Sequence, residues 1–206
     1  RVARAVQRLG LRHAVVTSVN RDELPDGGAA IFAETIREIH RLCSQMSVEV
    51  LIPDFQGNLE ALGVVMEAGP EILNHNLETV PRLYRLMRPQ AKYAQSLELL
   101  RRARQMRLDI PIKSGIMVGA GETLAELHQT IRDIALQGTN ILTVGQYLQP
   151  SPRHVSVARF YHPDEFVELK RFASELGFEH VESGPLVRSS YHAAEQVNSE
   201  IEECHF

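Results

Sequence analysis

Short apolar runs, each followed by a polar loop and then a helical pattern, recur along the chain and constrain its fold more than any other feature. Because the runs are continuously apolar, we read them as parallel strands buried on both faces. The connections are long enough for right-handed crossovers. The predicted strands span 13–19, 48–53, 71–74, 110–118, 141–147 and 178–182, and the predicted helices span 1–9, 31–43, 58–68, 80–87, 92–107, 124–136 and 163–176.

About six such strand–helix units predict an α/β fold, and they favour a barrel or part-barrel over an open sheet. With 206 residues the chain can hold one core, so we expect a single domain over 1–206, with 184–206 as a C-terminal segment. The net charge of −4 does not indicate a nucleic-acid-binding protein, because such proteins usually carry an excess of basic residues. No run approaches the roughly 20 apolar residues of a membrane helix. The two cysteines, Cys43 and Cys204, suit a reducing, cytoplasmic setting.

Polar side chains gather where the predicted strands end. Parallel α/β folds place ligands at the carboxyl ends of their strands, so these stretches should share one rim. They are 17–28, 54–58, 74–79, 119–122 and 146–153.

Of these loops, the stretch 17–28 has the most polar and charged side chains. Asp26-Gly27-Gly28 is typical of a tight turn that leaves bare amides near a ligand. Arg21, Asp22 and Glu23 could hold an amine and a carboxylate. They could equally pair with one another, which is the commoner role of such residues at a surface.

Asn74-His75-Asn76-Leu77-Glu78 places four hydrogen-bonding side chains in five residues. Such a group suits a ribose diol or a small polar substrate, and it is equally typical of a helix cap with a loop histidine. A metal-binding role for His75 is disfavoured, because no second ligand stands at helical spacing from it.

Glycines interrupt the apolar run that begins at Lys113. Gly115 lies inside the predicted strand, where glycine weakens the strand unless a ligand or a backbone approaches closely. Gly119 and Gly121 then open the exit from the strand. This is not a phosphate-binding loop, because the lysine and hydroxyl of GxxxxGK[ST] are absent.

Arg82, Arg85 and Arg88 are spaced three apart and so line one side of a predicted helix. They could form a solvated face or meet an acidic protein partner, and Arg88, next to Pro89, could turn back over the rim. Further on, Ser189 and Ser190 follow the last strand. Without a GxSxG elbow they do not predict an acyl-transfer nucleophile.

Taken together, these stretches closely resemble the lipoyl synthases, which are radical S-adenosylmethionine enzymes. The resemblance runs in family order over nearly the whole chain, and its last motif is particularly specific. The matching stretches are TSVNRDELPDGG at 17–28, NHNLET at 74–79, KSGIMVG at 113–119, GQYLQPS at 145–151 and GPLVRSSYHA at 184–193.

The resemblance implies a partial (β/α)6 radical-SAM barrel with two [4Fe-4S] clusters. One cluster would bind and reduce S-adenosylmethionine, giving a 5′-deoxyadenosyl radical that abstracts hydrogen from C6 and C8 of a protein-bound octanoyl group. The auxiliary cluster would supply the two sulfurs. The implied partners are octanoylated lipoyl-carrier proteins, namely the E2 lipoyl domains of 2-oxoacid dehydrogenases and the glycine cleavage H protein. A reductant such as flavodoxin or ferredoxin is also implied.

The resemblance also implies a role for particular residues. One serine of the RSSY motif, Ser189 in preference to Ser190, would ligate an iron of the auxiliary cluster. For S-adenosylmethionine, the implied binding residues are Arg21, Asp22, Asp26, Gly27 and Gly28 at the methionine end, Asn74, Asn76 and Glu78 at the ribose, and Gly115 and Gly119 at the adenine.

Both cysteine motifs of that family, CxxxCxxC and CxxxxCxxxxxC, are absent from this sequence, and Cys43 and Cys204 belong to neither. We therefore expect a fragment that lacks the first strand and the N-terminal extension, holds neither cluster alone, is inactive by itself and dissolves poorly. The alternative from another class is a cluster-less module that binds a lipoyl-carrier protein through Arg82, Arg85 and Arg88.

Overall fold

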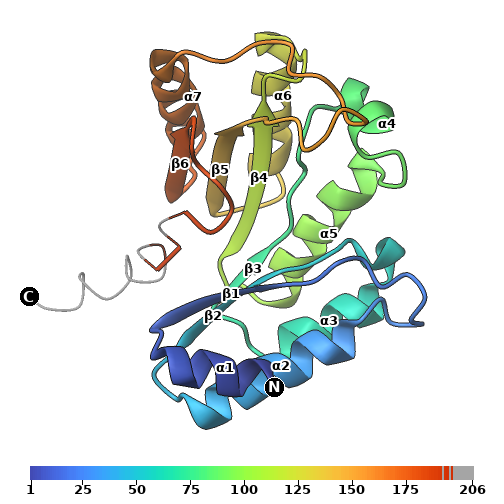
Figure 1. Ribbon diagram of the computed structural model, residues 1–206, viewed down its shortest axis with the longest axis vertical. Helices are drawn as coiled ribbons and strands as arrows, with labels where there is room; N and C mark the ends of the chain where they lie inside the picture. Colours follow the sequence, from blue (N-terminus) through green and yellow to red (C-terminus); the bar gives the residue numbers. More distant parts are fainter. Residues whose placement is uncertain (192, 195, 197–206) are drawn as a thin grey trace, which may run out of the picture.

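A computed structural model describes residues 1–191, 193, 194 and 196, and its centre is one curved sheet of six parallel strands (Figure 1). Each strand pairs in parallel with the next, so the spatial order follows the chain order, with β1 and β6 at the two ends. This arrangement confirms the predicted α/β part-barrel. The strands are β1 (His13–Thr17), β2 (Ser47–Leu51), β3 (Ile72–Asn74), β4 (Ile112–Val118), β5 (Ile141–Gln146) and β6 (His180–Gly184).

The helices form a layer along the sheet. None of those in the described part of the chain is long and apolar enough to cross a membrane. The helices are α1 (Val2–Leu9), α2 (Ala29–Leu42), α3 (Leu59–Glu67), α4 (Tyr84–Met87), α5 (Tyr93–Met106), α6 (Leu124–Ala135) and α7 (Pro163–Glu175), with 3-10 turns at Phe55–Gly57 and Pro81–Leu83. In this layer α1, α2, α3, α5, α6 and α7 pack in that order and α4 stands apart.

Capping side chains fix where two of these helices begin. The Asn58 side chain accepts hydrogen bonds from the Glu60 and Ala61 amides at the start of α3. Thr123 and Glu126 form a reciprocal capping box at α6. The predicted helix 80–87 is shorter than expected: a 3-10 turn opens it, and only one α-helical turn follows.

The sheet separates an apolar layer from a polar interior. Helix residues such as Ile36, Leu100 and Leu127 are fully buried in the apolar core. Several buried strand residues are instead polar or charged: Glu49, Asn74, Lys113, Thr143 and Gln146. Polar groups at full burial must be paired, so the interior of the part-barrel needs a connected set of partners.

Candidate functional site

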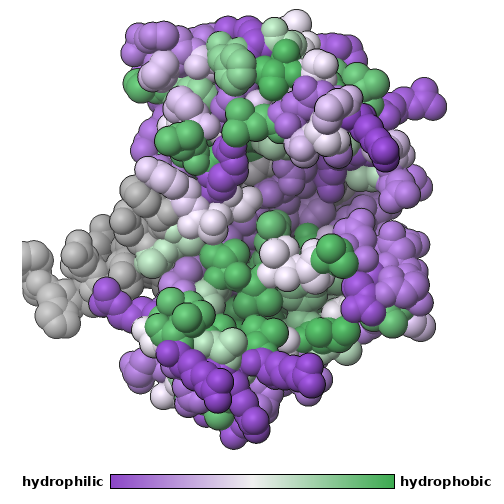
Figure 2. Space-filling view, viewed as in Figure 1, coloured by the Kyte–Doolittle hydropathy of each residue, from purple (hydrophilic) through white to green (hydrophobic). Residues whose placement is uncertain are grey.

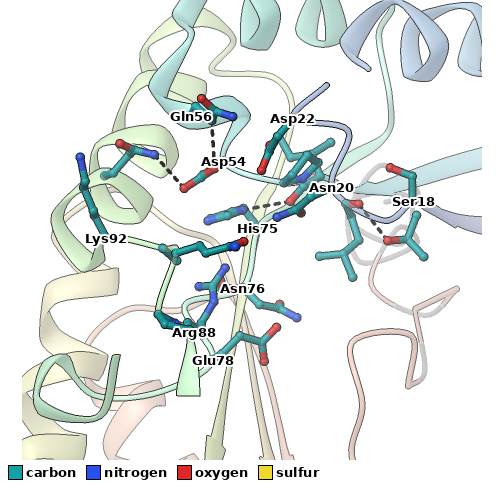
Figure 3. A pocket seen from close by; sticks show the side chains of 18 residues that line it. Ser18, Asn20, Asp22, Asp54, Gln56, His75, Asn76, Glu78, Arg88 and Lys92 are labelled. Carbon is teal, nitrogen blue, oxygen red and sulfur yellow. Dashed lines mark hydrogen bonds between the residues drawn. The ribbon is translucent and has the colours of Figure 1, made fainter. Parts of the chain in front are cut away.

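A cavity of about 650 Å³ opens at the carboxyl ends of β1, β2 and β3 (Figure 3). On the face drawn in Figure 2 the molecule is hollowed near its middle, with hydrophilic side chains in the hollow and hydrophobic ones gathered below it. The cavity brings three of the predicted polar stretches to one rim. Its lining comes from Thr17, Ser18, Asn20 and Asp22 after β1, from Leu51–Asp54 and Gln56 after β2, from His75, Asn76 and Glu78 after β3, and from Arg88–Lys92 and Gln95.

The stretch after β1 contributes only its first half to the cavity. Asp22 lines it and is exposed, whereas Arg21 pairs with Glu23. Asp26 lies over the start of α2, where its carboxylate accepts hydrogen bonds from the Gly28 and Ala30 amides at 2.9 and 2.8 Å. These bonds, Ala30 first, lower the pKa of Asp26.

Gly27 and Gly28 adopt left-handed backbone angles, with φ of 60° and 89°. A side chain at Gly27 would collide with Phe55, so this turn packs closely against the loop after β2. The structure therefore places Asp22 at the cavity and assigns Asp26, Gly27 and Gly28 contacts with the chain's own loops. Their predicted cofactor contacts stay predictions.

The stretch 74–79, which begins at the last residue of β3, is buried except for the half-buried Glu78. Asn74 donates to the Glu49 carboxylate at 2.8 Å, and His75 has partners on both ring nitrogens, the Ile52 carbonyl and the Ser96 hydroxyl, each at 3.0 Å. A carbonyl can only accept, so Nδ1 of His75 carries the proton and Nε2 accepts from Ser96. Burial lowers the pKa of His75 to about 4, which leaves the ring neutral at pH 7.

Asn76 and Glu78 form the inner edge of the cavity. The Asn76 amide donates to the Ser189 hydroxyl at 2.8 Å, while its buried Oδ1 has no partner among the described residues. Glu78 has a φ of 68°, and its backbone bonds to Gly115 and Met117 hold it beside β4. Burial raises the pKa of the Glu78 carboxyl, which the nearby Arg88 guanidinium opposes.

Arg88 turns back over the rim, which was one of the three alternatives that its sequence context left open. Its guanidinium donates to the Asn76 and Leu77 carbonyls at 3.0 and 3.2 Å. Arg82 instead forms a two-bond ion pair with Glu126, at 2.7 and 3.0 Å. Of the three arginines, only the exposed Arg85 has no partner in the described part of the chain. The three therefore do not form one free basic face.

The glycines of β4 make room for the chain itself. A side chain on Gly115 would collide with Thr143 and Asn76, and one on Gly119 would collide with Gln146 and the Arg159 carbonyl. The close approach that the sequence predicted at Gly115 is thus made by this chain's own groups, and Gly119, just after β4, is crowded in the same way. The predicted adenine contact of Gly115 and Gly119 stays a prediction.

A second cavity, about 780 Å³, adjoins the first and shares Glu78, Arg88 and Pro89 with it. Its other lining residues are mostly apolar: Leu86, Met87, Met117, Tyr147, Pro150, Arg153, His154, Val155 and Ser156. The stretch 146–153 pointed to part of this wall, but no sequence pattern connected it with Met117.

The segment that follows β6 folds back over the sheet. The Val187 carbonyl lies where a side chain on Gly145 would stand, so this glycine of β5 admits the segment. Ser189, half-buried, reaches Asn76, whereas Ser190 is exposed. Cys204 lies outside the described residues, and Cys43 is half-buried at the end of α2.

Two charged residues of the interior were missed by the sequence reasoning. Lys113 donates to Glu49 at 3.0 Å and to Gln196 at 2.7 Å, and both charged side chains are fully buried. The available signal was a charged residue in each of two apolar runs, Val48-Glu49-Val50 and Ile112-Lys113. No group of three His, Cys, Asp or Glu side chains within the described part of the chain could hold a metal ion.

Comparisons with known proteins agree with this geometry. Residues 1–134 match the model of the radical SAM superfamily. The chain is 58% identical to the lipoyl synthase of Rubrobacter xylanophilus over 197 residues, covering 96% of this chain and 61% of that protein. It is 59% identical to the lipoyl synthase of Symbiobacterium thermophilum, covering 95% of this chain and 61% of that protein. The chain thus spans about three fifths of the length of these relatives.

Solved structures show the same fold at low sequence identity. Methylornithine synthase superimposes with a TM-score of 0.58 at 15% identity, covering 91% of this chain and 63% of that one. SuiB of Streptococcus suis superimposes with a TM-score of 0.61 at 8% identity, covering all of this chain and 46% of that one.

Proposed function

Because the chain belongs to the radical SAM superfamily and matches lipoyl synthases along almost its whole length, we propose that it forms the cofactor-binding part-barrel of a lipoyl synthase. That enzyme is a sulfurtransferase that inserts two sulfurs, at C6 and C8 of a protein-bound octanoyl group. The observation that carries the proposal is the Asn76–Ser189 hydrogen bond. It joins two stretches 113 residues apart in sequence at the edge of one polar cavity.

The donor and acceptor set of the cavity fits S-adenosylmethionine, the cofactor of the radical SAM superfamily. The Asn76 Oδ1 is buried without a partner in the described part of the chain, so it is free to accept from a ligand. Glu78 supplies a carboxylate that can accept from hydroxyls, and Asp22 supplies one that can face an amine. When bound, the cofactor supplies the radical that removes hydrogen from carbon. The chain's own residues bind it, orient it and keep water away.

Iron–sulfur clusters also belong to the chemistry of this superfamily, but the described residues do not fit one by themselves. They include a single cysteine, at the end of α2, and no three-ligand group. We propose two [4Fe-4S] clusters whose thiolates come from the part of the full-length relatives that this chain does not match. Ser189, the inward serine of the pair, would donate one oxygen ligand to the auxiliary cluster.

The proposed partners follow from the same activity. They are octanoylated lipoyl-carrier proteins and a cytoplasmic reductant such as flavodoxin or ferredoxin. The alternative of a cluster-less module that binds a carrier through Arg82, Arg85 and Arg88 loses support, because Arg82 and Arg88 are occupied by Glu126 and by backbone carbonyls.

The test uses the full-length protein that contains this chain, reconstituted with iron and sulfide under anaerobic conditions. Given dithionite, S-adenosylmethionine and an octanoyl-lysine peptide, it should convert two C–H bonds of the peptide to C–SH, so that mass spectrometry detects a dithiol product with two more sulfurs and an unchanged number of hydrogens. Cleavage of S-adenosylmethionine without sulfur insertion, or no reaction at all, would overturn the proposed activity.

A binding measurement tests the cavity separately. The substitution Glu78→Gln should weaken S-adenosylmethionine binding about tenfold in equilibrium dialysis, because a charged acceptor is worth more than a neutral one. The matched control is Glu34→Gln, an exposed carboxylate on α2 that should leave binding unchanged. Equal binding by both variants would remove Glu78 from the site.

A further inference from the structure

Lys113 is among the largest fully buried side chains of the structure as described, and it lies at the beginning of β4 inside the part-barrel. Its ammonium donates to Glu49 of β2 at 3.0 Å and to Gln196 of the C-terminal segment at 2.7 Å. Glu49 in turn accepts from Asn74 of β3 at 2.8 Å. One connected set of bonds thus links three strands to the chain end.

Burying this charge pair is costly, and the cost is recovered only when the remaining hydrogen-bonding capacity is used. An ammonium group has three donors and no acceptor, so Glu49 alone does not satisfy Lys113. The side-chain carbonyl oxygen of Gln196 provides a second acceptor. The Lys113 side chain is fully buried, so water does not provide one. Charge-assisted bonds of this kind are about twice as strong as neutral ones, so the Lys113–Gln196 contact holds the segment firmly.

The bond reaches the part of the chain that carries Ser189. Gln196 also donates to the Tyr191 carbonyl at 3.2 Å, two residues beyond Ser189. On the other side, Val187 is buried with its carbonyl against Gly145. The described residues after β6 are therefore held at three places: Val187 at Gly145, Ser189 at Asn76, and Gln196 at Lys113.

We propose that the buried Lys113–Glu49 pair is a latch that positions residues 185–191 through Gln196, and so sets the place of the Ser189 hydroxyl at the edge of the cavity. Lys113 is a positioning residue, because it acts on Ser189 through Gln196 and the turn at Tyr191. The inference rests on the proposed function only for the role of Ser189, whereas the latch itself concerns the chain's own contacts.

The latch explains why two apolar runs each carry one buried charge. If the pair only stabilised the barrel, an apolar pair of similar volume would serve at least as well. An apolar side chain in place of Lys113 could not donate a hydrogen bond to Gln196, whereas the ammonium group does.

The test is hydrogen exchange of the full-length protein, followed by mass spectrometry on peptides that cover 185–191. The Val187 amide donates to the Gly184 carbonyl at the end of β6 and the Tyr191 amide to the Arg188 carbonyl, so their exchange reports local opening of these residues. Gln196→Ala should speed exchange of these peptides about tenfold and leave β4 and β5 unchanged. Gln196→Glu, which keeps an acceptor for Lys113, should restore slow exchange. The matched control is Gln137→Ala, which removes a glutamine bonded to the Asp133 carbonyl at the end of α6 and should leave exchange over 185–191 unchanged.

A second experiment asks whether the effect passes through Lys113. In the double variant Glu49→Gln with Lys113→Met, the charges are removed together, so neither is left buried and unpaired. Exchange over 185–191 should already be fast, and adding Gln196→Ala should change it no further.

Three outcomes would overturn the latch: unchanged exchange in Gln196→Ala, an equal rise in β4 and β5, or additive effects of Gln196→Ala in the charge-free background. None of these bears on the proposed activity, because exchange is read without turnover. Conversely, a protein that inserts no sulfur could still show the latch.

Discussion

The loops after β1 and after β3 are equally polar in sequence, yet the structure uses them in opposite ways. In the loop after β1, covering 17–28, Asp22 is exposed, and the Asp26 carboxylate accepts hydrogen bonds from amides at the start of α2. In the loop after β3, covering 74–79, Asn74 and His75 are buried and bonded to elements behind the rim.

The difference shows that burial, rather than polarity, decides what such a loop can do. An exposed polar side chain is satisfied by water, so it can be changed at small cost. A buried one must find a protein partner, and changing it leaves that partner unsatisfied. The loop after β3 should therefore be the sensitive one, for stability as well as for the site.

The largest expected effect is on the pH dependence of stability, through His75. The folded-state pKa is lowered from 6.5 to about 4, chiefly by burial, so the unfolded chain binds this proton first as the pH falls. The contribution of neutral His75 is fully present above about pH 6.5 and is lost as the pH falls towards 4. Between pH 7.5 and 5, the free energy of unfolding should drop by about 2 kcal/mol more in the native chain than in His75→Gln, measured by urea unfolding.

His154→Gln is the control for this measurement, since His154 is exposed on the loop after β5. It should keep the steep pH dependence of the native chain. An equally steep dependence in His75→Gln would show that His75 is not the buried neutral group that the structure describes.

The next effect concerns Asn74. Asn74→Ala removes a donor from a fully buried carboxylate, Glu49, and should lower the free energy of unfolding by about 1.5 kcal/mol at pH 7. Asn20→Ala, a change at an exposed cavity residue of the loop after β1, should stay within about 0.5 kcal/mol in the same urea titration. If the two variants lost the same free energy of unfolding, burial would not explain the difference between the two loops.

The sequence was a good guide to the order of elements and to the rim. Continuous apolar runs predicted all six strands and their parallel arrangement, because a strand buried on both faces has no other pattern. The same logic brought the loops at 17–28, 54–58 and 74–79 to one cavity. Where an end differed, local geometry explains it: β4 begins at Ile112, after Pro111, which has no amide hydrogen to donate.

The direction of individual side chains was not predictable in the same way. Nothing in the local sequence says that Asn74 faces Glu49 while Asn76 faces Ser189, because those partners lie 25 and 113 residues away. Gly145 shows the same limit. Its meaning depends on Val187, which the chain brings back only after β6. Such contacts follow from the curvature of the sheet, which no periodicity of residues encodes.

The smallest effect tests the loop after β1 from within. Asp26→Ala removes two hydrogen bonds to amides at the start of α2 and should cost about 1 kcal/mol, as loss of a helix cap does. The bonds lower the pKa of Asp26, so their contribution is present above its ordinary value, near 3.8, and is lost as the pH falls through the lower folded value. Urea unfolding between pH 5 and 2 should therefore show a weaker acid dependence in Asp26→Ala.

Asp22→Ala, four residues earlier and exposed, should change stability by less than about 0.5 kcal/mol and keep that acid dependence. Equal losses in the two variants would mean that the loop is held as a whole, and that its exposed half is no freer than its capping half.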